Sequence, residues 1–201
     1  QVKRNKGAPG VDGVTVDAFP DYLKHYWSSI RAQLLEGSYR PKPVRRVEIP
    51  KPDGRKRKLG IPTVLDRFIQ QALAQVLQVQ WEARFHKHSY GFRPRRSAHQ
   101  AIRHAQTTIK AGYRWIVDCD LDAFFDRVNH DVLMTRLKQH TQDDDVLRLI
   151  NRYLKAGVRR GDKTVASVEG VPQGGPLSPV LSNIVLNELD WELDRRGHHF
   201  A

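Results

Sequence analysis

Closely spaced aspartates are the first residues whose types and spacing suggest chemistry. Asp118 and Asp120 lie two apart in the apolar stretch 115–120, so the period of a β-strand would place both carboxylates on one face. Asp120 would end that strand beside a turn, and the backbone carbonyl of Leu121 would follow it. Oxygen donors of this kind suit Mg²⁺, which keeps waters and substrate phosphates in its shell. Asp120 and Leu121 are therefore candidate Mg²⁺ ligands, with an ordinary surface charge as the alternative.

A glycine-proline segment, GVPQGGPLSPVLSN at 170–183, is the second candidate. Paired glycines ahead of a proline-started helix allow a ligand to approach the backbone and the helix N–H groups. Gln173, just before Gly174, offers both a donor and an acceptor to a base or a sugar. The alternative is a generic turn before a helix.

A basic hairpin is the third candidate. Lys51 and Arg57 lie on opposite sides of the turn Pro52-Asp53-Gly54, so both can reach over a chain of phosphates. Arginine gives bidentate phosphate contact and lysine a point charge. The alternative is an exposed edge hairpin whose charges oppose aggregation.

Charge along the chain favours a polyanionic partner. The net charge is +12, with nine Lys/Arg in 40–60 and eight Lys/Arg without any acid in 83–117, whereas 118–145 carries eight Asp against three basic residues. Basic segments around an acidic one are typical of a phosphate-binding surface with a local acidic site; solvated helix faces are the alternative. The single cysteine, Cys119, cannot form an internal disulfide and fits a reducing compartment, so we expect a cytoplasmic protein. The two long uncharged runs, 68–81 and 170–187, are rich in Gln or in Pro and Gly, so neither is a membrane span and we expect no membrane partner.

The surrounding pattern predicts an α+β fold, because helical stretches alternate with short antiparallel strand pairs. The hydrophobic fraction of 39% is that of a folded chain. The expected helices cover about 17–35, 63–85, 97–110, 131–139 and 143–155, and a last helix is expected to bury Leu177, Leu181, Ile184, Leu189 and Leu193 at helical spacing. The expected strands are a hairpin in 45–62, a strand at 115–120 and a pair within 158–171.

Taken in order, these segments resemble a reverse transcriptase of the bacterial group II intron-encoded reverse transcriptase/maturase type. The resemblance rests on IPKPDGRKRKLGIPTVLDRFIQQAL (49–73), FRPRRS (92–97), VDCDLDAFFD (117–126) and GVPQGGPLSPVLSNIVLNELD (170–190), preceded by NKGAPGVDGVTVDAF (5–19). It implies a right-hand polymerase in which 1–36 is an N-terminal extension, 37–112 the fingers and 113–201 a partial palm with a small antiparallel sheet.

The resemblance also implies roles for single residues. Asp120 matches the first catalytic, metal-binding aspartate of the palm, and Leu121 the carbonyl ligand after it. Phe125 matches the aromatic that excludes a ribose 2′-hydroxyl, with Phe124 as the neighbouring alternative. The nucleotide-binding set is completed by Lys51 and Arg57 at the triphosphate and by Gln173 and Gly174 beside the sugar and the templating pair; Arg93, Arg95 and Arg96 match a block along the template path.

One departure separates this sequence from the family pattern. A strand-turn-strand with Tyr-X-Asp-Asp is expected after the last helix, where the sequence reads GHHFA (197–201). We therefore expect a fragment of fingers and partial palm, without thumb and maturase regions, that does not polymerise alone.

For the parent protein the resemblance implies RNA-directed DNA polymerase activity with Mg²⁺. Its expected partners are an RNA template, a DNA primer, deoxynucleoside triphosphates and a group II intron RNA, whose splicing and mobility it would assist. The alternatives are an RNA-binding maturase-type module without polymerase activity, or a retron-like, diversity-generating or defence-associated reverse transcriptase.

Overall fold

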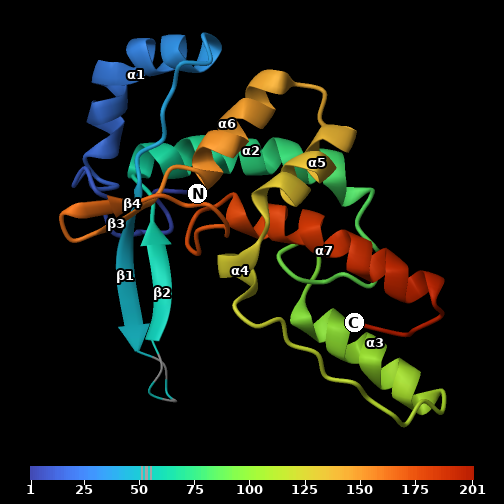
Figure 1. Ribbon diagram of the computed structural model, residues 1–201. Helices are drawn as coiled ribbons and strands as arrows, with labels where there is room; N and C mark the ends of the chain where they lie inside the picture. The colour runs from blue at the N-terminus through green and yellow to red at the C-terminus, as the bar shows by residue number, and fades with distance from the viewer. Residues whose placement is uncertain (51, 53, 55) are drawn as a thin grey trace.

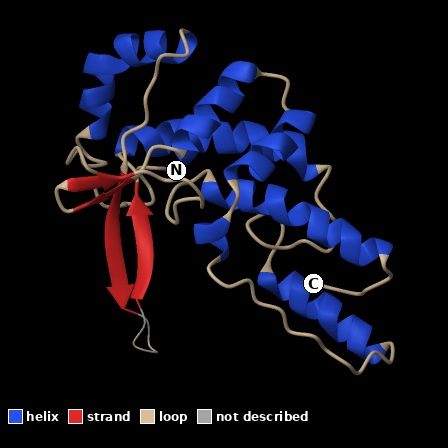
Figure 2. Ribbon diagram, viewed as in Figure 1, coloured by secondary structure: helices blue, strands red, loops and turns tan. Residues whose placement is uncertain are grey.

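The computed structural model describes residues 1–50, 52, 54 and 56–201. A small sheet lies at one side of the molecule and its long hairpin projects away from the helices, which make up the rest of the molecule (Figures 1 and 2). In chain order the elements are α1 (Phe19–Leu35), β1 (Val44–Pro50), β2 (Lys56–Ile61), α2 (Val64–Glu82), α3 (Ala98–Lys110), α4 (Phe124–Arg127), α5 (His130–His140), α6 (Asp144–Leu154), β3 (Val158–Arg160), β4 (Lys163–Val165) and α7 (Ser178–Arg195). The predicted α+β class is confirmed.

Local capping explains where the helices begin. Thr63 accepts a hydrogen bond from the backbone of Asp66 at the start of α2, and Ser97 forms a capping box with Gln100 at the start of α3. Asn129 and Asp143 cap α5 and α6 in the same way. Each of these side chains satisfies backbone N–H groups that a helix leaves free, so the helices predicted at these positions are confirmed.

The sheet has the strand order β2-β1-β3-β4. The predicted hairpin is confirmed: β1 and β2 pair antiparallel with Glu48 opposite Lys58. However, β1 and β3 pair in parallel, with Val44 opposite Val158, so the expectation of a purely antiparallel sheet is wrong. The helices between these strands return the chain beside β1 in the same direction, which is the connection that a parallel pair needs.

Two hydrophobic clusters form the core. The larger one joins α2 to α5, α6 and α7 through side chains such as Leu77, Leu137 and Leu181. The second joins α1 to α2 and α6 through Phe19, Val64 and Tyr153, among others. Each cluster spans more than one of the blocks 1–36, 37–112 and 113–201, so that division remains a prediction.

A buried polar cluster connects the start of α2 to the segment before β1. Tyr39 and Thr63 each donate a hydroxyl hydrogen bond of 2.7 Å to Asp66. The backbone of Lys42 donates a third, at 3.3 Å. Burial raises the pKa of Asp66 and also that of Tyr39, because the charged forms of both groups lose solvation.

The strand predicted at 115–120 is wrong. The whole stretch from Tyr113 to Leu121 is an exposed loop, and Trp115 is 98% exposed. Apolar β-formers become a strand only when another strand supplies hydrogen bonds, and no strand of the described part of the chain pairs with this stretch.

Among the described helices, none has the length and apolarity needed to cross a membrane.

Candidate active site

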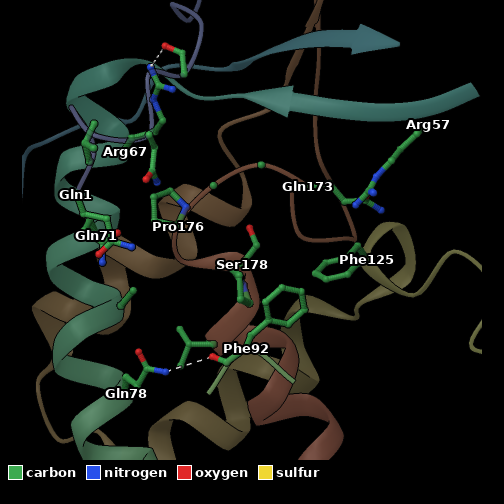
Figure 3. A pocket seen from close by; sticks show the side chains of 18 residues that line it. Gln1, Arg57, Arg67, Gln71, Gln78, Phe92, Phe125, Gln173, Pro176 and Ser178 are labelled. Atoms are coloured by element: carbon green, nitrogen blue, oxygen red, sulfur yellow. Dashed lines mark hydrogen bonds between the residues drawn. The ribbon is translucent and has the colours of Figure 1, made fainter. Parts of the chain in front are cut away.

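A pocket of about 550 Å³ opens between α2, the start of α7 and the loop that precedes α7. Figure 3 shows side chains from distant parts of the sequence directed into it. Of the residues predicted from sequence, Arg57, Phe125, Gln173 and Gly174 line this pocket. The structure therefore brings together one residue of the basic hairpin, one of α4 and two of the glycine-rich loop.

The loop 170–176 is held by hydrogen bonds from three directions. The backbone N–H of Gly60 in β2 donates to the carbonyl of Gln173 at 2.8 Å. The backbone N–H of Val171 donates to the carbonyl of Phe125 in α4 at 2.6 Å. The hydroxyl of Ser178 in α7 donates to the carbonyl of Pro172 at 2.6 Å. These contacts connect hairpin, α4 and α7, and they fix the loop that forms one wall of the pocket.

Two glycines of this loop are required by close backbone approaches. A Cβ at Gly170 would lie 2.7 Å from the carbonyl oxygen of Asp126, and one at Gly174 would lie 2.7 Å from that of Gly60. Both residues also have a positive φ, 84° and 123° respectively. A side chain at either position would clash and strain the backbone.

Arg57 is exposed at the end of the hairpin, and its Nε donates to Oε1 of Gln173 at 3.1 Å. This bond joins Arg57 to Gln173, which the family resemblance assigns to the same nucleotide-binding set. Within the described residues Gln173 is the hydrogen-bond partner recorded for the Arg57 side chain, and a guanidinium carries five N–H donors, so it has donors to offer a phosphate as well. Lys51, predicted to act beside Arg57, lies outside the described residues.

Phe124 and Phe125 are adjacent in sequence but face different surroundings. Phe124 packs against the larger hydrophobic cluster, whereas Phe125 lines the pocket. Their ring planes lie 71° apart at a centroid distance of 5.6 Å. The short α4 starts after Ala123, whose φ is 50°. The geometry therefore favours Phe125 over Phe124 as the aromatic that meets a ligand.

Asp120 and Leu121 lie in the exposed loop before α4, and neither is among the pocket-lining residues identified in the described chain. Their oxygen atoms are suitable Mg²⁺ donors. However, no group of three or more His, Cys, Asp or Glu side chains in the described ranges is placed to hold a metal ion. The donor chemistry thus fits Mg²⁺, but the described residues do not assemble a complete ion site.

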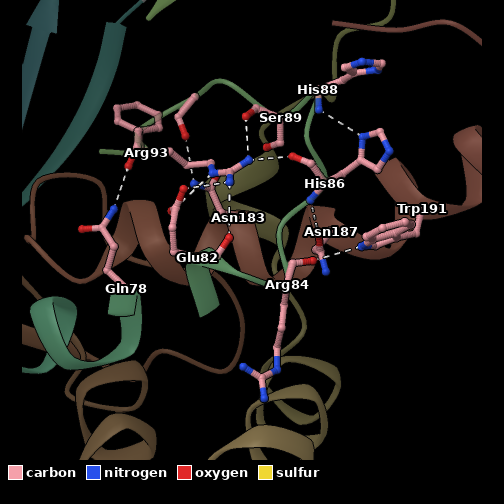
Figure 4. Close-up of polar contacts among 12 residues, drawn as sticks. Gln78, Glu82, Arg84, His86, His88, Ser89, Arg93, Asn183, Asn187 and Trp191 are labelled. Atoms are coloured by element: carbon pink, nitrogen blue, oxygen red, sulfur yellow. Dashed lines mark hydrogen bonds and ion pairs between the residues drawn. The ribbon is translucent and has the colours of Figure 1, made fainter. Parts of the chain in front are cut away.

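The three arginines predicted to contact nucleic acid have different surroundings. Arg93 is only 7% exposed; it donates to a carboxylate oxygen of Glu82 at 2.8 Å and to the carbonyls of His86 and Ser89 at 2.6 and 2.8 Å (Figure 4). Arg95 is exposed, and Arg96 lies over the ring of Tyr90 at 5.5 Å. This geometry favours a positioning role for Arg93 and leaves Arg95 and Arg96 as the accessible charges.

Several pocket residues carried no signal that singled them out in the sequence. Arg67, Gln71 and Gln78 come from one face of α2, at a spacing that a helical periodicity could have grouped. Arg67 donates to the carbonyl of Ala8 at 2.9 Å, and burial lowers its pKa. Phe92 also lines the pocket, and only its position in the FRPRRS block could have indicated it.

Comparison with known families gives the class of protein. The profile of the family "Reverse transcriptase (RNA-dependent DNA polymerase)" matches residues 49–201. The match covers most of the chain, and the chain belongs to the reverse transcriptase family. Enzymes of this family act on nucleic-acid templates and generally use a divalent metal ion.

Individual relatives show that this reverse transcriptase is of the group II intron type, which confirms the resemblance seen in the sequence. The chain is 42% identical over 198 residues to Protein YkfC of Escherichia coli K12, covering 96% of this chain and 52% of YkfC. It is 39% identical over 190 residues to the group II intron-encoded protein LtrA of Lactococcus lactis subsp. cremoris, covering 92% of this chain and 31% of LtrA. The chain thus spans about half or less of these relatives.

A solved structure agrees with the fold. A chain of a partial Cas6-RT-Cas1–Cas2 complex superposes with a TM-score of 0.54 at 26% sequence identity, covering 86% of this chain and 30% of that chain.

Proposed function

We propose that the protein is an RNA-directed DNA polymerase that adds deoxynucleotides to a DNA primer on an RNA template, and that it assists the splicing and mobility of a group II intron RNA. The observation that carries the proposal is the meeting of Arg57, Phe125 and Gln173 at one pocket. A cation, a planar ring and an amide fit the triphosphate, the sugar and the base of a nucleotide. The likeness to LtrA supports the group II intron assignment.

Each pocket residue has a proposed task. Arg57, together with Lys51, binds the triphosphate of the incoming nucleotide. Phe125 packs below the sugar and leaves no room for a 2′-hydroxyl. Gln173 and Gly174 contact the sugar and the templating base pair. Catalysis in this scheme is mostly positioning and charge neutralisation, as in other phosphoryl transfers.

The reaction joins the primer 3′-oxygen to the α-phosphorus of the nucleotide and breaks the bond to pyrophosphate, which leaves. We assign Asp120 and the Leu121 carbonyl as Mg²⁺ ligands on the donor chemistry given above. Bound Mg²⁺ would neutralise charge that develops on the phosphates. Arg57, which lines the pocket from the hairpin, would hold the same phosphates through its guanidinium.

The nucleic acid itself is proposed to follow the basic surface. Arg95 and Arg96 are the accessible cations of the FRPRRS block, and we assign them to the template backbone. Residues 1–36, 37–112 and 113–201 are proposed as extension, fingers and palm, in a cytoplasmic protein. An RNA-binding maturase without polymerase activity would need the basic surface but not the pocket, so the pocket favours the polymerase.

Primer extension by the full-length protein on an RNA template tests this function. Phe125→Ala is expected to raise ribonucleotide use relative to deoxyribonucleotide use by about tenfold or more, because the space for the extra hydroxyl opens. Arg57→Ala is expected to raise the KM for nucleotide without changing sugar choice. Absence of extension by the wild-type protein would contradict the polymerase assignment, and relaxed sugar choice in Phe124→Ala alone would overturn the role of Phe125.

A further inference from the structure

Phe92 is an exposed aromatic side chain at the rim of the pocket. It is 69% exposed and lines the pocket together with Phe125 and Gln173. Its φ is 53°, in the left-handed region that bulky side chains rarely adopt. An exposed apolar residue alone is ordinary, but an exposed ring held in a strained backbone needs a reason.

Neighbouring elements fix the backbone around Phe92. The amide of Asn183 in α7 donates to the carbonyl of Gly91 at 2.9 Å. The amide of Gln78 in α2 donates to the carbonyl of Phe92 itself at 3.3 Å (Figure 3). The next residue is the buried Arg93, which bonds to Glu82 of α2. Two helices therefore hold this turn, and they fix the backbone from which the ring of Phe92 reaches the pocket.

The surroundings of the ring indicate the chemistry of its ligand. Arg57 supplies a cation and Gln173 an amide to the same pocket, and Arg95 supplies a second, exposed cation three residues after Phe92 in the chain. An aromatic face beside a cationic path is the arrangement that binds nucleic acid, since any base can stack on the ring while the cations follow the phosphates.

We propose that Phe92 is a preorganised platform on which a nucleobase stacks in this pocket. The proposal rests on the proposed function for the kind of ligand, a polynucleotide or nucleotide. The family resemblance places the FRPRRS block along the template path without a role for Phe92 itself, and the proposal gives this residue one. The base comes either from the template strand or from the incoming nucleotide, and the two sources share the stacking chemistry.

Equilibrium binding by the full-length protein tests the platform without requiring catalysis. A fluorescently labelled RNA template annealed to a DNA primer is titrated with wild type, Phe92→Ala, Phe92→Leu and Phe92→Tyr. If the stacked base belongs to the template, Phe92→Ala and Phe92→Leu should weaken binding about tenfold, the usual loss for one stacked base. Phe92→Tyr should bind like wild type because it keeps the ring. Thermal unfolding of all four proteins checks that the fold is retained.

A template with an abasic nucleotide at the position opposite the incoming nucleotide identifies the source. If the template base stacks on Phe92, the abasic template binds wild type and Phe92→Ala equally. If the nucleotide base stacks instead, template affinity is unchanged in Phe92→Ala, and the KM for nucleotide rises about tenfold. Equal affinity and equal KM in all four proteins, or a Phe92→Leu protein that matches Phe92→Tyr, would overturn the platform.

The test separates this inference from the proposed function. Suppose that the full-length protein does not extend primers, but that Phe92→Ala lowers template affinity and Phe92→Tyr does not. This result would contradict the proposed polymerase function and support the stacking role of Phe92. Primer extension by the wild type, with template affinity and nucleotide KM unchanged by every Phe92 substitution, would support the polymerase function and contradict the stacking role of Phe92.

Discussion

The loop 170–176 and the loop 113–121 both carry residues predicted to act in chemistry, yet the molecule holds them very differently. Hydrogen bonds with β2, α4 and the Ser178 hydroxyl of α7 hold the first in place. The second is exposed along its length and contains Trp115, Ile116 and Val117 with most of their surface open to solvent. The wall of the pocket that carries Gln173 and Gly174 is therefore preformed, whereas the loop that carries Asp120, the proposed metal ligand, pairs with no strand of the described chain.

The physical basis of this difference is the source of the hydrogen bonds. Turns and glycines let the loop 170–176 satisfy its backbone groups with neighbours close in space. The loop 113–121 has the composition of a buried strand, and such a strand needs a partner along its whole edge. Among the described elements none pairs with it, and water is left to satisfy its backbone.

The largest expected effect is the loss of polymerase activity when Asp120, in the exposed loop 113–121, is replaced. Asp120→Ala in the full-length protein should lower kcat for primer extension by at least about a hundredfold, as loss of transition-state charge stabilisation does. Because Asp120 is exposed, the free energy of unfolding should change by less than about 0.5 kcal/mol. Primer extension and urea denaturation measure the two quantities. Asp122→Ala is the matched control, and an equally inactive control would contradict the assignment.

The opposite pattern, a large effect on stability, is expected at Arg93, whose guanidinium is held by Glu82, His86 and Ser89. Arg93→Ala should lower the free energy of unfolding by about 2 to 4 kcal/mol, because it leaves acceptors of a buried guanidinium without a donor. Arg95→Ala should leave stability nearly unchanged but weaken RNA binding and reduce the salt slope by about one counterion. Denaturation and binding at several salt concentrations check both. Wild-type stability in Arg93→Ala would remove its positioning role.

Two glycines with a positive φ, Gly170 and Gly161, should differ in how much stability is lost when each is replaced by alanine. Gly170→Ala should destabilise the fold by about 2 to 3 kcal/mol, because its Cβ would meet the Asp126 carbonyl oxygen at 2.7 Å and φ is positive. Gly161 also has a positive φ but no neighbouring atom within 4 Å of the built Cβ. Gly161→Ala should therefore cost only the strain, about 1 kcal/mol. Equal losses in the two variants, measured by urea denaturation, would argue against the close approach.

The smallest expected effect concerns pH. Burial, followed by the charges of His104 and His86, lowers the pKa of His88 to about 4. The unfolded chain then binds the proton more readily, so stability present above the usual histidine pKa is lost as the pH falls from about 6.5 toward 4. His88→Gln should flatten this part of the stability profile, measured by urea denaturation between pH 7 and pH 4. An unchanged slope would contradict the pKa shift.

Sequence reasoning worked where the determinants are local. The hairpin, the Thr63 and Ser97 caps and the final helix follow from nearby residues, and the structure has all of them. It failed for the strand at 115–120 and for the parallel pairing of β1 with β3, because both depend on which segments meet in space.

The candidate site shows the same division. The family resemblance placed Arg57, Phe125, Gln173 and Gly174 in one set, and they line one pocket. The burial of Arg93 was not predictable from FRPRRS, because its carboxylate partner, Glu82, lies on α2. Lys51 stays a prediction, and the metal roles of Asp120 and Leu121 stay proposals.

The parallel contact between β1 and β3 has a consequence for how the chain folds. Val44 and Val158, which pair in the sheet, are separated in the chain by β2 and by the helices α2 to α6, whereas β1 and β2 are joined by a short turn. Closing so long a loop is entropically costly, and contacts of this kind slow folding. We therefore expect the hairpin to form early and the strand pair β3–β4 to join it late. A pulse-labelling hydrogen-exchange experiment would see protection at Leu59 before protection at Val44, whose N–H donates to Gly157.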